Sequence, residues 1–203
     1  MDHSPYKFTE YFDEKGSGWH ADKRHINILH NLSMASPLNS LLCEIGCCNG
    51  ASTSAFIEAM KRRKDLRLLL FDIKITKELL RLVNESGVAD RVEIREHPVY
   101  DSLTDTAQLV FIDGNHGWPA LADLAVCLVL ECRVIVLHDT NGYSPAMRKH
   151  QHGSILAAKV LKQSPKRIFW EDCQKREGER THRGFLVSWP KEENWPCSVL
   201  PLV

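Results

Sequence analysis

Five short apolar runs alternate with helix-like segments along most of the chain, and this alternation constrains the possible folds more than any other feature of the sequence. The runs are LLCEI (41–45), LRLLLFDI (66–73), RVEIRE (91–96), QLVFID (108–113) and RVIVLHD (133–139). Runs that are apolar on both faces suit parallel strands covered by helices on each side. The helix-like segments between them span 52–63, 76–86 and 119–130. This order predicts an α/β fold with a doubly wound sheet built from right-handed strand–helix–strand units.

The two ends of the chain differ from this pattern. Residues 1–18 mix proline, glycine and charged residues without a period, which predicts an irregular lead-in or lid. Helices are expected over 19–32 and 154–161. The apolar runs KRIFW (166–170) and GFLVSW (184–189) flank a polar stretch, which predicts an antiparallel pair of strands with a long charged loop.

Composition narrows the range of partners. The 203 residues favour one domain spanning 1–203, and 26 basic residues balance 26 acidic ones, so nucleic acid is not an expected partner. No apolar run approaches the roughly 20 residues that cross a bilayer, so no membrane partner is expected. The seven cysteines include three in apolar runs, where a reduced thiol behaves as a small hydrophobe. We therefore expect a soluble, cytoplasmic protein, with a homo-oligomer left open.

The stretch EIGCCNGAS (44–52) joins the first predicted strand to the following helix. Gly46 and Gly50 permit a tight turn at which backbone N–H groups and the helix N-terminus can approach a ligand closely. A metal site is disfavoured, because Cys47 and Cys48 are adjacent and do not form a C-x-x-C pair. The spacing G-x-x-x-G also differs from the G-x-G-x-x-G of dinucleotide-binding proteins, which argues against NAD. The pattern favours a loop for a different cofactor.

A second polar group follows the fourth and fifth predicted strands. Asp113 ends the fourth strand, His116 follows it in the pattern D-G-x-H, and the fifth strand ends in His138 and Asp139. Ligands of doubly wound folds bind at this edge of the sheet. A neutral histidine near its ordinary pKa is suited to removing a proton, so His116 is the candidate general base. The alternative is a loop histidine that caps a helix or fills space.

These motifs, in this order, resemble those of the class I S-adenosylmethionine-dependent methyltransferases. E-x-G-x-x-x-G resembles their first motif, and D-G-x-H followed by Asp123 on the next helix resembles a subfamily that includes macrocin-type O-methyltransferases and cephalosporin-hydroxylase-like proteins. The resemblance extends over roughly 19–189. It implies a Rossmann-like methyltransferase fold: a mostly parallel seven-stranded sheet with one antiparallel C-terminal strand and helices on both faces.

The resemblance also implies that the cofactor is S-adenosylmethionine. Asp72, which follows the second predicted strand, would accept hydrogen bonds from the ribose hydroxyls, and the adenine contact would fall within 96–99. The residues expected around the cofactor are Glu44, Gly46, Cys47, Asn49, Gly50, Ser52, Asp72, His97 and Asp113.

In metal-dependent relatives, acids at the ends of the fourth and fifth strands bind Mg²⁺. The corresponding candidates are Asp113, His138 and Asp139, and the ion would be Mg²⁺ or Mn²⁺. Because histidine is a poor ligand for Mg²⁺, three possibilities stay open: a softer ion, coordination by the aspartates alone, or no metal.

The expected function is methylation of a hydroxyl on a small acceptor molecule, with Asp113 and His116 as catalytic residues. The polar loop 138–154 offers Tyr143, Arg148, His150 and His152 as candidate substrate contacts. Two alternatives remain: a different enzyme on the same fold, and a nonenzymatic module that binds the cofactor or a nucleoside.

Overall fold

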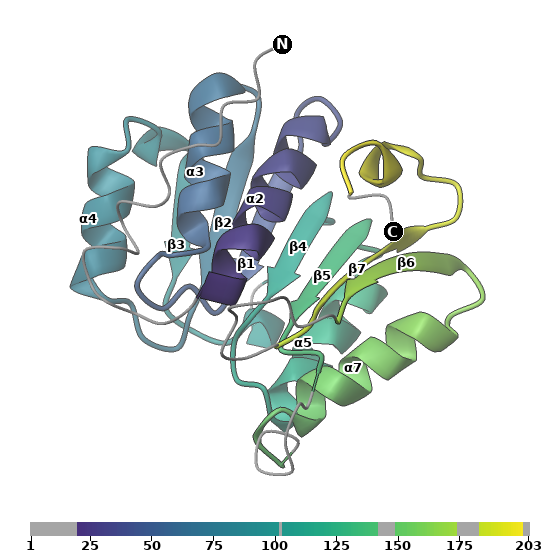
Figure 1. The fold of residues 1–203 in the computed structure, drawn as a ribbon. Helices are drawn as coiled ribbons and strands as arrows, with labels where there is room; N and C mark the ends of the chain where they lie inside the picture. The colour runs from purple at the N-terminus through teal and green to yellow at the C-terminus, as the bar shows by residue number, and fades with distance from the viewer. Residues whose placement is uncertain (1–19, 102, 142–148, 174–182, 201–203) are drawn as a thin grey trace.

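Seven strands form one sheet in the order β3-β2-β1-β4-β5-β7-β6 (Figure 1). The computed structural model describes residues 20–101, 103–141, 149–173 and 183–200. The strands are β1 (Leu41–Ile45), β2 (Arg67–Phe71), β3 (Val92–Arg95), β4 (Leu109–Ile112), β5 (Val134–His138), β6 (Arg167–Asp172) and β7 (Phe185–Pro190).

Strands β1 to β5 run parallel to one another, and β7 is antiparallel to both of its neighbours. In β1, Cys43 pairs with Leu69 of β2 on one side and with Val110 of β4 on the other. In β7, Leu186 pairs with Leu137 of β5 and with Glu171 of β6. The predicted fold, a mostly parallel seven-stranded sheet with one reversed C-terminal strand, is confirmed.

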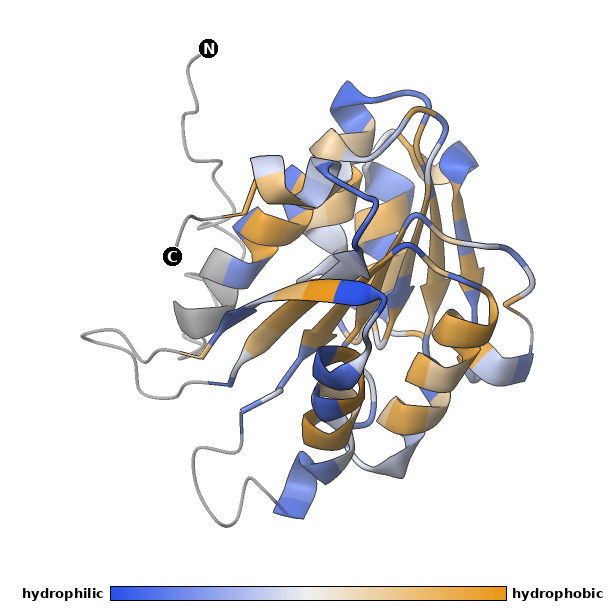
Figure 2. Ribbon diagram, turned by 90° about the vertical axis from the view of Figure 1, so that its right-hand side faces the viewer, coloured by the Kyte–Doolittle hydropathy of each residue, from blue (hydrophilic) through white to orange (hydrophobic). Residues whose placement is uncertain are grey.

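Helices cover both faces of the sheet (Figures 1 and 2). The core on one face contains side chains of α2 (His20–Ala35), α3 (Thr53–Arg62) and α4 (Lys77–Glu85). The core on the other face contains side chains of α5 (Trp118–Val129) and α7 (His152–Gln163). Among the described residues, no helix is long and apolar enough to span a membrane.

Neighbouring residues of β1 supply the two cores alternately. Leu42 belongs to the core beneath α2 and α3, whereas Cys43 belongs to the core beneath α5 and α7. This alternation follows from the two-residue period of a strand, and it explains why the central strands are apolar on both faces.

Most predicted elements agree with the structure to within a few residues. The largest differences are at helix ends: α2 continues to Ala35, and α7 begins at His152. Three short 3-10 helices, η1 (Ala89–Arg91), η2 (Val99–Asp101) and η3 (Trp195–Ser198), were not predicted. The predicted lead-in or lid at 1–18 lies outside the described residues.

The strand order reverses direction between β1 and β4. The chain moves outward from β1 to β2 and β3, and then returns to place β4 on the other side of β1. Loops after β1 and β4 therefore diverge at the carboxyl edge of the sheet, which is where open α/β folds bind their ligands.

Candidate active site

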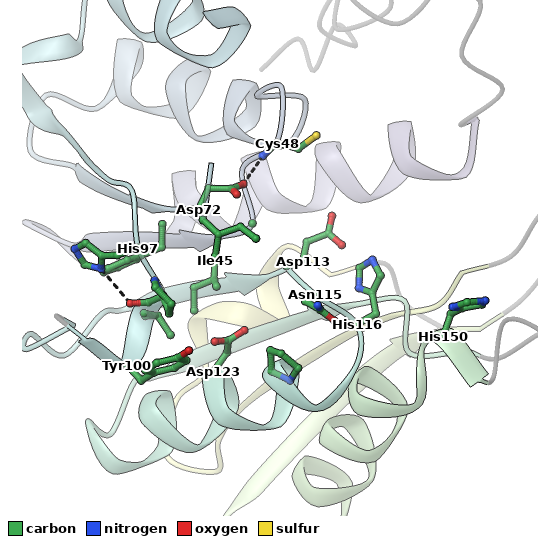
Figure 3. A pocket seen from close by; sticks show the side chains of 17 residues that line it. Ile45, Cys48, Asp72, His97, Tyr100, Asp113, Asn115, His116, Asp123 and His150 are labelled. Atoms are coloured by element: carbon green, nitrogen blue, oxygen red, sulfur yellow. Dashed lines mark hydrogen bonds between the residues drawn. The ribbon is translucent and has the colours of Figure 1, made fainter. Parts of the chain in front are cut away.

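A cavity of about 620 Å³ opens at this edge of the sheet (Figure 3). Its walls come from the loops that follow β1, β2, β3 and β4, and from the first half of α5. The volume falls within the usual range for small-molecule and cofactor sites, roughly 300–1,000 Å³. Of the residues predicted for the site, Gly46, Asp72, His97, Asp113 and His116 line it.

Gly46 allows two loops of the cavity floor to touch. Its φ of +89° is in the left-handed region, and a Cβ added there would lie 2.4 Å from the Cα of Gly114. Its N–H donates to the carbonyl of Phe71 at 2.8 Å. The glycine therefore brings the end of β1 against the end of β4, and no larger residue fits. Gly50 faces α4 instead, since a Cβ there would lie 2.6 Å from Cδ2 of Leu82.

Glu44 supports the loop from below and does not line the cavity. It is fully buried, its Oε2 accepts a hydrogen bond from the Thr53 hydroxyl at 2.6 Å, and its Oε1 accepts one from the Ser52 hydroxyl. Burial raises the pKa of Glu44 to about 8, although both hydroxyls act to lower it. Glu44 and Ser52 thus connect β1 to the start of α3.

Asp72 lies just after β2, at the position predicted for ribose recognition. Its Oδ2 accepts from the Cys48 N–H at 2.8 Å, and its Oδ1 accepts from the Lys74 N–H at 3.1 Å. These backbone donors orient the carboxylate, which lines the cavity. Among the loop residues, Cys48 lines the cavity, whereas the predicted Cys47 is buried and Asn49 does not reach it.

The loop after β3 forms the end of the cavity farthest from His116 (Figure 3). His97 lines this end together with Pro98, Val99 and Tyr100. Glu96, at the edge of the expected adenine contact, accepts a hydrogen bond from the backbone N–H of Ile75 at 3.2 Å and does not line the cavity.

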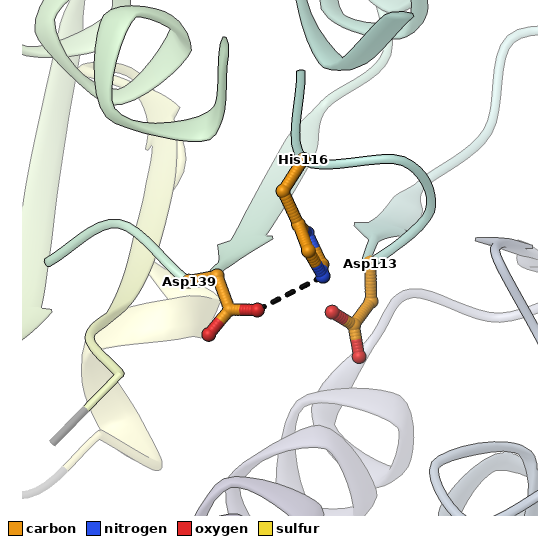
Figure 4. A group of neighbouring side chains, drawn as sticks. All are labelled: Asp113, His116 and Asp139. Carbon is orange, nitrogen blue, oxygen red and sulfur yellow. Dashed lines mark ion pairs between the residues drawn. The ribbon is translucent and has the colours of Figure 1, made fainter. Parts of the chain in front are cut away.

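His116 and Asp139 form a pair at the opposite end (Figure 4). Nε2 of His116 lies 3.0 Å from Oδ2 of Asp139. Burial lowers the pKa of His116, but the hydrogen bond and the charge of Asp139, together with the charge of Asp113, outweigh burial and raise it. Burial raises the pKa of Asp139, but His116, His138 and Arg183 outweigh that effect and lower it. The pair therefore favours a charged imidazole beside a charged carboxylate.

Asp139 is held by the C-terminal strand pair. Its φ of +56° is unusual for a residue other than glycine. Arg183 Nη1 lies 3.7 Å from its Oδ2. Gly184 permits this approach, because a Cβ there would lie 2.6 Å from the Thr140 hydroxyl and from the Asn141 nitrogen. Sequence reasoning missed Arg183, which stands in a run of charged residues without any distinguishing spacing.

The loop that carries His116 is anchored by the start of α7. The backbone N–H groups of Gly153 and Ser154 donate to the carbonyl of His116 at 2.9 and 3.2 Å. A Cβ on Gly153 would lie 1.6 Å from the carbonyl oxygen of Gly117, so only glycine fits at this crossing. A residue 37 positions later in the chain thus fixes the backbone of His116.

The structure brings Asp113, His116 and Asp139 together as a possible cation site. One ligand atom from each lies within 4.8 Å of the others. The predicted third ligand, His138, lies outside this group and instead places its Nδ1 2.9 Å from Oδ1 of Asp113. Two carboxylates with one imidazole suit Mn²⁺, Fe²⁺ or Zn²⁺ better than Mg²⁺.

Of the candidate substrate contacts after β5, His150 lines the cavity. His152 packs its ring against Trp118, with ring centroids 5.3 Å apart, and does not line it. Tyr143 and Arg148 lie outside the described residues.

Comparisons with known proteins agree with this geometry. Residues 43–140 match a family described as a methyltransferase domain. No curated protein matches the chain.

Two O-methyltransferases are among the solved structures that share the fold. The O-methyltransferase TomG from Streptomyces achromogenes, which is involved in tomaymycin synthesis and was solved with S-adenosylmethionine, is 18% identical to this chain. Its TM-score is 0.68, and the match covers 94% of this chain and 90% of that one. An O-methyltransferase from Bacillus cereus, solved with S-adenosylhomocysteine, is 14% identical, with a TM-score of 0.65 and coverage of 94% and 92%. These structures confirm the predicted fold, that of the class I methyltransferases.

Proposed function

We propose that this chain, which carries a methyltransferase domain over residues 43–140, transfers the methyl group of S-adenosylmethionine to a hydroxyl of a small acceptor. The observation that carries this proposal is the His116–Asp139 pair, with 3.0 Å between Nε2 and Oδ2, at one end of the cofactor-sized cavity. The two structural relatives described above are O-methyltransferases, which supports oxygen as the acceptor atom.

The residues that line the cavity fit this cofactor. Asp72 presents a carboxylate already oriented by two backbone N–H groups, so its remaining lone pairs can accept from ribose hydroxyls. The loop at Gly46 keeps the cavity floor free of side chains where β1 meets β4. S-adenosylmethionine, when bound, would supply a methyl group on a positively charged sulfur. An oxygen nucleophile can attack this methyl carbon, with S-adenosylhomocysteine as the leaving group.

His116 would remove the acceptor's proton. His116 acts as the base in its neutral form, although Asp139 raises its pKa toward the charged form. In the neutral ring, Nε2–H donates to Asp139, the lone pair is on Nδ1, and Nδ1 takes the proton from the hydroxyl. Asp139 fixes this tautomer and stabilises the imidazolium that results, as carboxylates do in other histidine-based catalysts. The anchored carbonyl of His116 holds the ring in position without using either ring nitrogen.

If a cation bound to Asp113, His116 and Asp139, the imidazole of His116 would be a metal ligand and not the general base. A bound divalent ion would lower the pKa of the acceptor hydroxyl and orient it. Nε2 cannot donate to Asp139 and coordinate an ion at once. Because these three side chains lie close together, metal-assisted methyl transfer is the second candidate mechanism.

The first test is calorimetric binding of S-adenosylhomocysteine with EDTA, and again with Mg²⁺ or Mn²⁺, with NAD as the control. We expect binding that is lost in Asp72→Ala and retained in His116→Ala. A screen of hydroxylated acceptors follows, with methyl transfer as the measurement. Absence of binding under every condition would refute the proposed function, and binding without turnover on any acceptor would favour a nonenzymatic module.

A further inference from the structure

Asp123 is the one charged residue of helix α5, whose sequence is WPALADLAVCLV. It occupies the middle of the helix, so it caps neither end. Its side chain is 6% exposed and lines the cavity. Figure 3 shows it beside Tyr100, across the cavity from Asp72. An acid on an otherwise apolar, core-facing helix calls for a partner.

Within the part of the chain that the structure describes, no hydrogen bond or ion pair reaches the Asp123 carboxylate. Burial alone raises its pKa, to about 6. The other two carboxylates of the cavity each have a partner within the protein: backbone N–H groups for Asp72, and His138 for Asp113. An ionised carboxylate buried without a donor is unfavourable. Asp123 therefore presents an unused acceptor to whatever fills the cavity.

The position of Asp123 indicates which part of a ligand it meets. A nucleoside whose ribose lies at Asp72 and whose reactive end lies near His116 would place its base at the other end, against Pro98, Val99 and Tyr100. Adenine carries nitrogen acceptors on its ring and one hydrogen-bond donor on its exposed edge, the exocyclic amine. A carboxylate acceptor complements that amine and opposes a 6-oxo group.

We propose that Asp123 recognises the exocyclic amine of the cofactor's adenine and selects a 6-amino purine over a 6-oxo purine. This inference rests on the proposed function, because it takes the cofactor to be a nucleoside. It assigns recognition of the base to α5, whereas the sequence led us to expect it after β3, where Glu96 is engaged with Ile75.

Calorimetry with three probes tests the proposal: S-adenosylhomocysteine, S-inosylhomocysteine, which has an oxo group in place of the amine, and methylthioadenosine, which lacks the amino acid. We expect wild-type protein to prefer the adenosyl over the inosyl compound by about tenfold or more, as a charge-assisted hydrogen bond allows. Asp123→Asn should lose most of this preference, since an amide can turn its NH₂ toward the oxo group. Asp123→Asn should also weaken the binding of methylthioadenosine about tenfold, because this probe keeps the amine.

Asp101→Asn is the matched control, because Asp101 is an exposed acid on η2 beside the cavity and does not line it. It should bind all three probes as the wild type does. Thermal unfolding of both variants checks that each is folded. If Asp123→Asn kept the preference for the adenosyl compound, this inference would be overturned while the proposed function would stand. A loss of affinity confined to the two probes that carry the amino acid would also overturn it, because Asp123 would then bind the α-amino group. Failure of the wild type to bind any probe would overturn the proposed function and this inference together.

Discussion

Nε2 of His116 lies 3.0 Å from Oδ2 of Asp139, and each side chain shifts the pKa of the other in the direction that favours a charged pair. The two residues come from different strand ends, since His116 follows β4 and Asp139 follows β5. Arg183 approaches the same carboxylate from the start of β7. Three separate segments thus position one imidazole at the cavity.

Replacing His116 by alanine should abolish most methyl transfer and leave cofactor binding intact. Loss of a general base reduces turnover by about 10²–10⁴-fold, because the acceptor's proton then has no positioned receiver. The measurements are turnover and S-adenosylhomocysteine affinity on the same preparation. His152→Ala is the control, since His152 does not line the cavity. Full turnover in His116→Ala would rule out its role as the base.

In the metal-assisted version of the reaction, removal of divalent cations should lower turnover, and Mn²⁺ should restore it. Asp113, His116 and Asp139 offer ligand atoms within 4.8 Å of one another, and two carboxylates provide the charge that holds such an ion. The measurement is turnover after chelation and dialysis, followed by calorimetric titration with Mn²⁺. Asp139→Asn and Asp113→Asn should each weaken Mn²⁺ binding. Activity that survives chelation and dialysis undiminished would exclude a required metal.

The fold was predictable because the apolar runs are local features. β5 is buried along its whole length, and the sequence RVIVLHD carries that information without help from distant residues. The helix boundaries were less predictable. α7 begins at His152 because Gly153 crosses the backbone of Gly117, a contact between residues 36 positions apart that no local pattern encodes.

The site was predictable only where a residue's role follows from its position at a strand end. Asp72, Asp113 and His116 line the cavity, as their place after β2 and β4 suggested. Glu44 belongs to the motif, but the alternation along β1 points it toward α3 and away from the cavity. The sequence could not show whether His138 or His116 joins Asp113 and Asp139 in the candidate cation site, because the answer depends on the conformation of the loop after β4.

Gly46→Ala should destabilise the protein by about 2–4 kcal/mol, from a methyl group in a left-handed conformation together with a steric conflict. The added Cβ would lie 2.4 Å from the Cα of Gly114, and backbone atoms cannot turn aside as side chains do. Chemical denaturation measures the change. Gly87→Ala is the control, since Gly87 also has a positive φ, of +75°, but nothing lies within 4 Å of an added Cβ. Equal losses in the two variants would mean that the contact with Gly114 contributes nothing.

Glu44→Gln should flatten the dependence of stability on pH. Burial raises the pKa of Glu44 from 4.5 to about 8, so the folded protein binds a proton here that the unfolded chain releases between these values. The contribution to stability is complete below pH 4.5 and is lost as the pH rises through 8. Over this interval, each pH unit lowers the free energy of unfolding by up to about 1.4 kcal/mol.

Glutamine has nearly the shape of the protonated acid and no proton to release. In Glu44→Gln, the amide oxygen can accept from one of the Ser52 and Thr53 hydroxyls and the NH₂ can donate to the other, so the variant should exceed the wild type in stability above about pH 8. Glu44→Ala should instead lose about 2–4 kcal/mol at pH 5, because it leaves a cavity and takes the hydrogen-bond partner from the buried Thr53 hydroxyl and the partly buried Ser52 hydroxyl. Denaturation at several pH values measures both. Glu85→Gln, which alters an exposed acid at the end of α4, should follow the wild-type profile. Parallel profiles for the wild type and Glu44→Gln would mean that Glu44 is ionised in the folded protein, and β1 would then carry a buried negative charge beneath the loop that follows it.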